Sequence, residues 1–130
     1  MDFEISFIDD QQIAVIKTFG CATVEGFDAF LEAMLSDPRW RLGMSILGDH
    51  SELDMSGLSS QDIENLVSSR LLRADAIGTG RLAIVAGGSL TFGFGRVTEA
   101  YAENVLPYRM NIFYTTDEAL AWLREERAAH

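Results

Sequence analysis

Apolar and polar side chains alternate along the first residues of the chain, and this pattern predicts a half-buried strand. Phe3, Ile5 and Phe7 are separated by polar neighbours, and a period of two is typical of a strand with one face on a core. A polar break at positions 9–12 separates this strand from a second apolar run, Ile13 to Ile16. Two short strands around such a break predict an antiparallel β-hairpin.

The apolar positions that follow recur at intervals of three and four, which predicts amphipathic helices. Thr23 is placed to cap the first helix, and Pro38 is expected to end it because the residue before proline avoids helical backbone angles. A second helix has Ser59 and Asp62 as a capping box, and it is expected to continue to Gly78. Their apolar stripes are Val24, Phe27, Phe30, Leu31, Met34 and Leu35, then Ile63, Leu66, Val67, Leu71 and Leu72.

Short apolar runs predict the remaining strands, at Met44–Leu47, Leu82–Ala86 and Met110–Phe113. The polar stretch from Asp49 to Ser60 is interpreted as a loop. The last two helices are marked by Phe94, Val97, Tyr101 and Val105, and by the capping box Thr115 and Glu118 followed by Ala119, Leu120, Trp122 and Leu123.

These elements predict a single α/β domain covering residues 1–130, in the order ββαβαβαβα. Repeated strand–helix–strand units favour right-handed crossovers and a parallel sheet, while the hairpin makes the first strand antiparallel to its neighbour. We therefore expect a mixed, mostly parallel five-stranded sheet with an antiparallel first strand, packed with about four helices. The sequence leaves the order of the strands open.

The charge balance narrows the range of partners. The chain has 130 residues, with 20 acidic and 10 basic side chains and a formal net charge of -10. An acidic surface repels nucleic-acid phosphates and anionic lipid headgroups. We therefore expect no binding to nucleic acid and no electrostatic docking on membranes.

Cysteine usage and hydropathy point to the cytoplasm. Cys21 is the only cysteine, so no intrachain disulfide forms, which is typical of a reducing compartment. The N-terminus lacks the basic and apolar regions of a signal peptide, and no apolar run approaches the roughly 18 residues of a membrane span. We expect a cytoplasmic protein without membrane insertion.

Several segments of the second half resemble one family of small bacterial proteins. They are Gly80–Ala86, Phe92-Gly93, Arg96, Glu99, Tyr101, Asn111-Ile112-Phe113 and Glu118–Leu123. This series is similar to the SpoIIAA-like family, which has a STAS-like fold. The closing helix, Glu-Ala-Leu-Ala-Trp-Leu after a strand ending in Phe, is the most recognisable part. The motifs are structural, so the resemblance implies the fold more directly than a function.

The resemblance also implies a possible switch. STAS domains that antagonise anti-sigma factors bind a partner kinase and are phosphorylated on a serine at the start of a helix. The matching segment is Asp54–Leu58, which carries Met55 where a family-like sequence has Ser. The helix is predicted to begin later, near Ser59. Ser56 and Ser59 are the candidate phosphoacceptors. The fold is also similar to lipid-binding domains that hold an apolar ligand between sheet and helices.

In a parallel α/β sheet, ligands gather beyond the carboxyl ends of the strands. There, carboxylates beside His50 offer a divalent-metal site or an acid–base pair, with a solvated loop as the alternative. No recognised ligand spacing occurs, so we assign no metal, cofactor or catalytic residue. The predicted ligand or partner patch at this edge consists of Asp49, His50, Asp54, Ser56, Gly87, Gly88 and Ser89.

Three further features carry candidate functional residues: a glycine-rich turn, the single cysteine and a tryptophan. The glycine-rich turn at 87–89 resembles a phosphate-binding loop but lacks the Walker pattern, and Gly93 and Gly95 are expected to let the following helix approach the sheet. Cys21 precedes a helix start, which favours a reactive thiol with His50 as its partner, or else a small buried residue. Trp40, between two arginines, is a candidate interface anchor.

We carry forward hypotheses from different classes. The first is a non-enzymatic regulatory or protein-interaction module, homodimeric, that presents the patch to a protein partner. The second is a carrier or sensor of a small apolar ligand or lipid, with a cavity between the sheet and helices. The third is an enzyme with its site at the strand ends. The cavity residues of the second hypothesis are Phe27, Phe30, Phe94 and Tyr101, and the aromatics Phe92 and Trp122 are further candidates for a pocket or subunit contact.

Overall fold

The computed structural model describes residues 1–10, 12–103 and 105–128. These residues form a five-stranded sheet in the order β1-β2-β3-β4-β5. β1 is antiparallel to β2 and the other neighbours are parallel, which confirms the predicted mixed sheet. The strands are β1 (Asp2–Ile8), β2 (Ile13–Cys21), β3 (Ser45–Asp54), β4 (Leu82–Ala86) and β5 (Met110–Phe113). The helices are α1 (Val24–Leu35), α2 (Ser60–Leu72), α3 (Ala74–Ile77), α4 (Ser89–Ala102) and α5 (Thr116–Ala128).

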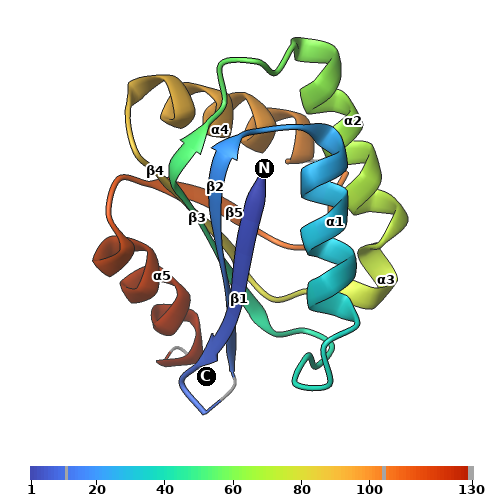
Figure 1. Cartoon of the computed structure of the whole chain (residues 1–130). Coiled ribbons are helices and arrows are strands. Elements are labelled where there is room, and N and C mark those ends of the chain that lie inside the picture. The colour runs from blue at the N-terminus through green and yellow to red at the C-terminus, as the bar shows by residue number, and fades with distance from the viewer. Residues whose placement is uncertain (11, 104, 129–130) are drawn as a thin grey trace.

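The sheet has a core on each face. α1 and α2 lie on one side and α5 on the other (Figure 1). The broad core joins the sheet to α1, α2 and α4, whereas the narrow core lies under α5. The broad core includes Ile16, Phe30, Ile46, Leu66, Ile84 and Ile112. The narrow core consists of Ile13, Leu47, Ala83, Val85, Ala119 and Leu123.

Local sequence signals explain where the helices begin. Thr23 Oγ1 accepts a hydrogen bond from the backbone N–H of Gly26 at 2.9 Å, so the predicted cap of α1 is confirmed. The capping box of Ser59 and Asp62 opens α2 with both of its hydrogen bonds. At the start of α5, the backbone N–H of Glu118 donates to Thr115 Oγ1 at 3.2 Å. These bonds satisfy amide groups that a helix start otherwise leaves unpaired.

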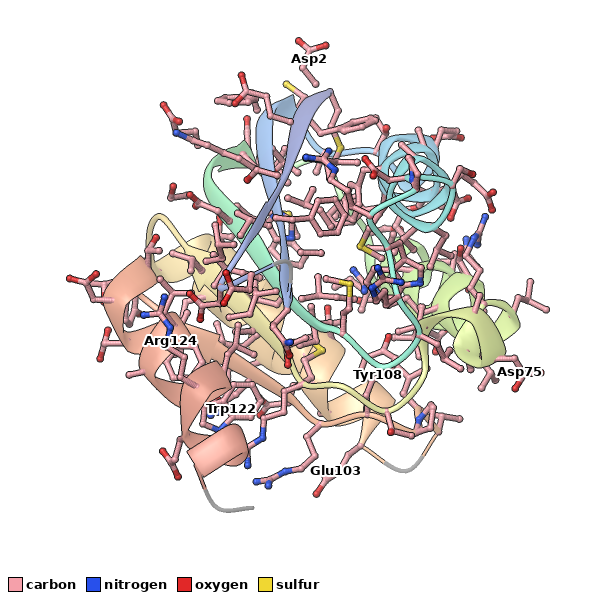
Figure 2. All side chains as sticks on the ribbon, turned by 90° about the horizontal axis from the view of Figure 1, so that it is seen from below. Asp2, Asp75, Glu103, Tyr108, Trp122 and Arg124 are labelled. Carbon is pink, nitrogen blue, oxygen red and sulfur yellow. The ribbon has the colours of Figure 1, made fainter. Side chains whose placement is uncertain are left out.

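α5 also forms an ion pair with the first hairpin. The Arg124 guanidinium donates to both carboxylate oxygens of Asp9, at 2.7 and 2.8 Å. Figure 2 shows Arg124 and Trp122 on this same helix. A paired guanidinium–carboxylate contact adds geometric specificity, and it connects the turn after β1 to the last helix.

The predicted loop from 49 to 60 is wrong over its first half, because residues 49–54 continue β3. β2 itself extends to Cys21, so Asp54 pairs with it at the strand end. Side chains on the outer face of this segment are exposed, which accounts for its polar composition. Between Lys17↔Asp49 and Phe19↔Glu52, β3 advances three positions and β2 advances two, which is a β-bulge.

Two helix predictions need correction. The helix expected to reach Gly78 ends at Leu72 and is followed by the short α3. Of the two glycines expected to let α4 approach the sheet, Gly95 fits, since a Cβ there would lie 2.8 Å from Ile112 Cδ1. Gly93 does not, because a Cβ at that position would meet nothing within 4 Å.

Candidate functional site

The turn between β4 and α4 lies directly against the end of β3. A Cβ added to Gly87 would come within 2.1 Å of the Ser51 carbonyl oxygen, so a side chain does not fit there. Gly88 and Ser89 are exposed. The structure therefore brings the predicted glycine turn and the polar end of β3 together at one edge of the sheet.

The carboxylates of Asp49 and Asp54 in the predicted patch accept hydrogen bonds from serines two positions later in the chain. Asp49 Oδ1 accepts hydrogen bonds from the Ser51 backbone N–H at 3.0 Å and from its hydroxyl at 2.6 Å. Asp54 Oδ1 accepts from the Ser56 backbone N–H at 2.9 Å, and the side-chain and backbone hydrogen bonds of Ser56 lower the Asp54 pKa. Within the described ranges, no group of three or more metal-ligating side chains converges.

His50 is part of the broad core, so the solvated-loop interpretation of this residue is wrong. Its side chain is 3% exposed, and Nδ1 shares a hydrogen bond with Thr18 Oγ1 at 2.7 Å. The ring lies 5.3 Å from the ring of Phe27 and 6.2 Å from that of Phe30, between centroids. Burial, aided by the positive charge of Arg70, lowers the pKa of His50 to about 3. His50 is therefore neutral at physiological pH.

The structure does not bring Cys21 and His50 together. Cys21 is exposed at the end of β2, where it pairs with Asp54, whereas His50 lies inside the core four positions earlier on β3. The imidazole is already bonded to Thr18. This geometry removes both the thiol–imidazole pair and the expectation of a buried cysteine.

Both candidate phosphoacceptors lie at the surface near the start of α2. Ser59 is the N-cap, with its hydroxyl accepting from the Asp62 backbone N–H at 3.1 Å. Ser56 lies in the preceding turn and is exposed. Capping accounts for Ser59 without any modification. The switch that the resemblance implies stays a prediction for both serines.

The candidate aromatic residues are distributed over both faces of the β-sheet. Trp40 packs against the broad core and its Nε1 donates to the Ala76 carbonyl at 3.1 Å, so its use as an interface anchor stays a prediction. Trp122 lies on the opposite face, 5.7 Å from the ring of Phe113. The structure therefore does not gather them into one pocket. The side chain of Tyr101 lies outside the described ones.

A small, mostly apolar cavity under α2 and α4 was missed by the sequence analysis. Its volume is about 30 Å³, and it is lined by Phe27, His50, Met55, Leu66, Arg70, Ile84, Thr91, Gly95, Thr98 and Met110. One of these residues, Arg70, lies in the last turn of α2, where a cation suits the helix dipole, yet it is buried. Its spacing could have revealed it, since Ile63, Leu66 and Val67 put Arg70 on the apolar stripe of α2.

The buried His50 predicts a specific sensitivity to acid. Its folded pKa of about 3 lies below the ordinary histidine pKa of 6.5, so between these pH values the unfolded chain binds a proton that the folded chain does not. The free energy of unfolding is then highest above this window and falls as pH drops through it, by about 1 kcal/mol per pH unit.

Urea unfolding at pH 7, 6 and 5 measures this slope. A His50→Gln variant shares the other titrating groups, so subtracting its slope isolates the contribution of His50. We expect the wild type to lose stability more steeply than the variant. Parallel slopes would contradict the assignment of a buried, neutral imidazole.

No family model and no curated protein sequence matches the chain. Among solved structures, it is similar to an uncharacterized protein of the DUF3478 family with a SpoIIAA-like fold, from Shewanella loihica PV-4. The two proteins share 25% sequence identity over 94% of this chain and 92% of that chain, with a TM-score of 0.61. Within the described residues, no helix is both long and apolar enough to cross a membrane. The resemblance and the fold class are confirmed: the chain has a SpoIIAA-like α/β fold.

Proposed function

We propose that the protein is a regulatory module that binds a protein partner through a groove between α2 and α4. The observation that carries this proposal is a surface groove of about 340 Å³ lined by Ser60, Ile63, Ser89, Gly93, Phe94 and Val97. Val97 remains 43% exposed there. Exposed apolar side chains framed by polar ones are typical of interaction sites.

The position of the groove supports regulation. Ser60 and Ser89 lie at the starts of the two helices that form it, and Ser59 immediately precedes Ser60. A phosphate on Ser59 would add about two negative charges beside the groove, at a helix start that stabilises them. Such a change would alter the attraction of a charged partner without any rearrangement of the core.

The partner that fits this groove is a protein with an apolar side chain surrounded by basic residues. The net charge of -10 favours a basic rim on the partner, and the apolar groove residues favour an apolar anchor. A SpoIIAA-like fold is consistent with protein interaction, and the solved neighbour adds no specific role.

A Val97→Glu variant tests the groove. We expect it to weaken binding of the partner about tenfold or more, because a charge replaces a contact at the centre of the site. A photo-crosslinking residue at position 97 identifies the partner, and calorimetry with the purified partner then gives Kd.

Val105→Glu is the matched control, because Val105 is 47% exposed and lies beyond the end of α4. Equal affinities of the two variants would contradict the groove as the binding site. Crosslinking as efficient from position 105 as from position 97 would contradict it too.

The structure gives less support to the alternative function of a lipid carrier. A carrier of a lipid needs a pocket of several hundred Å³, whereas the cavity between sheet and helices holds about 30 Å³. A homodimer and the cytoplasmic location stay predictions. Native mass spectrometry of protein purified from its host would report the number of subunits and the mass of any retained molecule.

A further inference from the structure

β1 lies at an edge of the sheet, and one of its sides is open. In the strand order it neighbours only β2, and Figure 1 shows it in front of the other strands. Every second residue of an edge strand points its backbone N–H and C=O groups away from the sheet. Among the described residues, no other strand pairs with these groups of β1.

Proteins commonly protect an edge strand from pairing with another chain, by lysine, proline, a β-bulge or a very short strand. β1 is seven residues long, contains neither lysine nor proline, and pairs with β2 without a register shift. Its two charged residues, Asp2 and Glu4, lie on its exposed face. The opposite edge, β5, is only four residues long. β1 is therefore the edge that is better suited to accept another strand.

The apolar side chains of β1 are buried less completely than those of β2. Phe3, Ile5 and Phe7 pack against the broad core but are only partly buried. The residues paired with them on β2 are at most 1% exposed; they are Thr18, Ile16 and Ala14. A strand added beside β1 would cover the apolar surface that remains at this edge.

The sequence of β1 is nearly symmetric about Ile5. In both directions from Ile5, a polar residue is followed by phenylalanine: Ser6 and Phe7 on one side, Glu4 and Phe3 on the other. We propose that β1 pairs with β1 of a second copy of this chain, antiparallel and about a two-fold axis at Ile5, so that the two sheets join into one. Phe3 then lies opposite Phe7 of the second copy, and Glu4 lies opposite its Ser6.

Side-chain faces and charges select this register. Directly opposite residues share a face, so the axis must pass through a residue if the apolar faces of the two copies are to be continuous. An axis at Glu4 would place the two Glu4 carboxylates opposite each other, which is unfavourable. An axis at Ser6 would leave Asp2 and Phe3 without partners in β1. The axis at Ile5 pairs all seven residues and opposes no like charges.

Sedimentation equilibrium of the full chain over the micromolar range measures the association. We expect the molecular mass to rise with concentration from that of one chain to that of two. Each copy has a net charge of -10, so salt should tighten the dimer by screening the repulsion. The mass of a single chain at every concentration would overturn the proposal. No residue of the groove between α2 and α4 belongs to β1, so dimerisation and partner binding in that groove are tested independently.

Opposite charges at position 6 test the contact with Glu4. Ser6→Glu puts a carboxylate opposite Glu4 twice in each dimer and should raise the dimer Kd about tenfold, whereas Ser6→Lys should lower it severalfold. Ser68→Glu and Ser68→Lys are the matched controls, because they change the net charge equally at an exposed position on α2. Their effect on Kd should be much smaller. Equal effects at positions 6 and 68 would contradict pairing through β1.

Disulfide formation determines the register. In a Cys21→Ser background, Ile5→Cys should link to its own copy, because residues opposite each other in an antiparallel pair have Cα atoms about 4.5–5.5 Å apart, within reach of a disulfide. Glu4→Cys alone should link poorly, whereas a mixture of Glu4→Cys and Ser6→Cys chains should link well. Failure of Ile5→Cys to link, or equally efficient linking of Glu4→Cys to itself, would overturn the axis at Ile5.

Discussion

Phe30→Ala should lower the free energy of unfolding by about 3–5 kcal/mol, the usual cost of removing a buried aromatic ring. Phe30 is 1% exposed and lies on α1 above the sheet. Its ring centroid is 5.2 Å from that of Phe27 and 6.2 Å from that of Phe3. The surrounding side chains come from α1, β1 and β3, so they cannot all move in to fill the space.

The same change should affect His50. The two rings lie 6.2 Å apart between centroids, and water entering the vacated space would hydrate the imidazole. Because burial is the largest cause of its lowered pKa, the pKa should move up toward its usual value. Chemical denaturation gives the loss of stability, and a histidine NMR titration gives the pKa.

Phe19→Ala is the control for this experiment. Phe19 is half-buried near the end of β2, where the Lys17 ammonium lies 5.4 Å from its ring. Its loss should cost less than about 1 kcal/mol, as at other positions outside the core. If the two alanine variants were equally stable, Phe30 would not hold α1 on the sheet as described.

Gly87→Ala should also destabilise the protein, by about 3 kcal/mol. The new Cβ would lie 2.1 Å from the carbonyl oxygen and 2.8 Å from the carbonyl carbon of Ser51. These are backbone atoms of β3, so the clash cannot be relieved by rotating a side chain. The ends of β3 and β4 must separate, and the turn that forms one side of the strand-end patch would shift with them.

Gly88→Ala is the matched control, because a Cβ there meets nothing within 4 Å and the backbone is extended, with φ of -171°. We expect its stability to stay within about 0.5 kcal/mol of the wild type. Thermal melts of the two variants make the comparison directly. A stable Gly87→Ala protein would show that the two strand ends are not packed as closely as the structure has them.

The features predicted well from the sequence are those encoded by neighbouring residues. The hairpin follows from alternation within a few positions, and the cap at Thr23 and the box at Ser59 and Asp62 each involve residues three apart. β4 was predicted with the bounds that the structure gives it, because its five residues are all apolar and all buried. Such signals need no knowledge of the rest of the chain.

The features that were missed depend on residues far apart in the sequence. Residues 49–54 form a strand because β2 continues alongside them, and their own polar composition hides this. His50 is buried because Phe27 and Phe30 of α1 cover it. Arg70 shares the apolar stripe of α2 in the sequence, but the cavity beside it forms only where α2, α4 and the sheet come together. The candidate patch therefore stays a prediction at its exposed turns, whereas His50 at its centre is buried in the interior.

The sequential order of the strands has a consequence for how the chain folds during synthesis. Because each strand pairs with the one before it, the sheet can grow from one edge as the ribosome delivers it, without threading any strand between two others. The face of the sheet that packs on α5 is covered later. Leu47, Ala83 and Val85 are covered by α5 at the end of the chain, so an otherwise complete nascent sheet exposes an apolar face until the last helix emerges. Stalled or truncated products should therefore depend on chaperones.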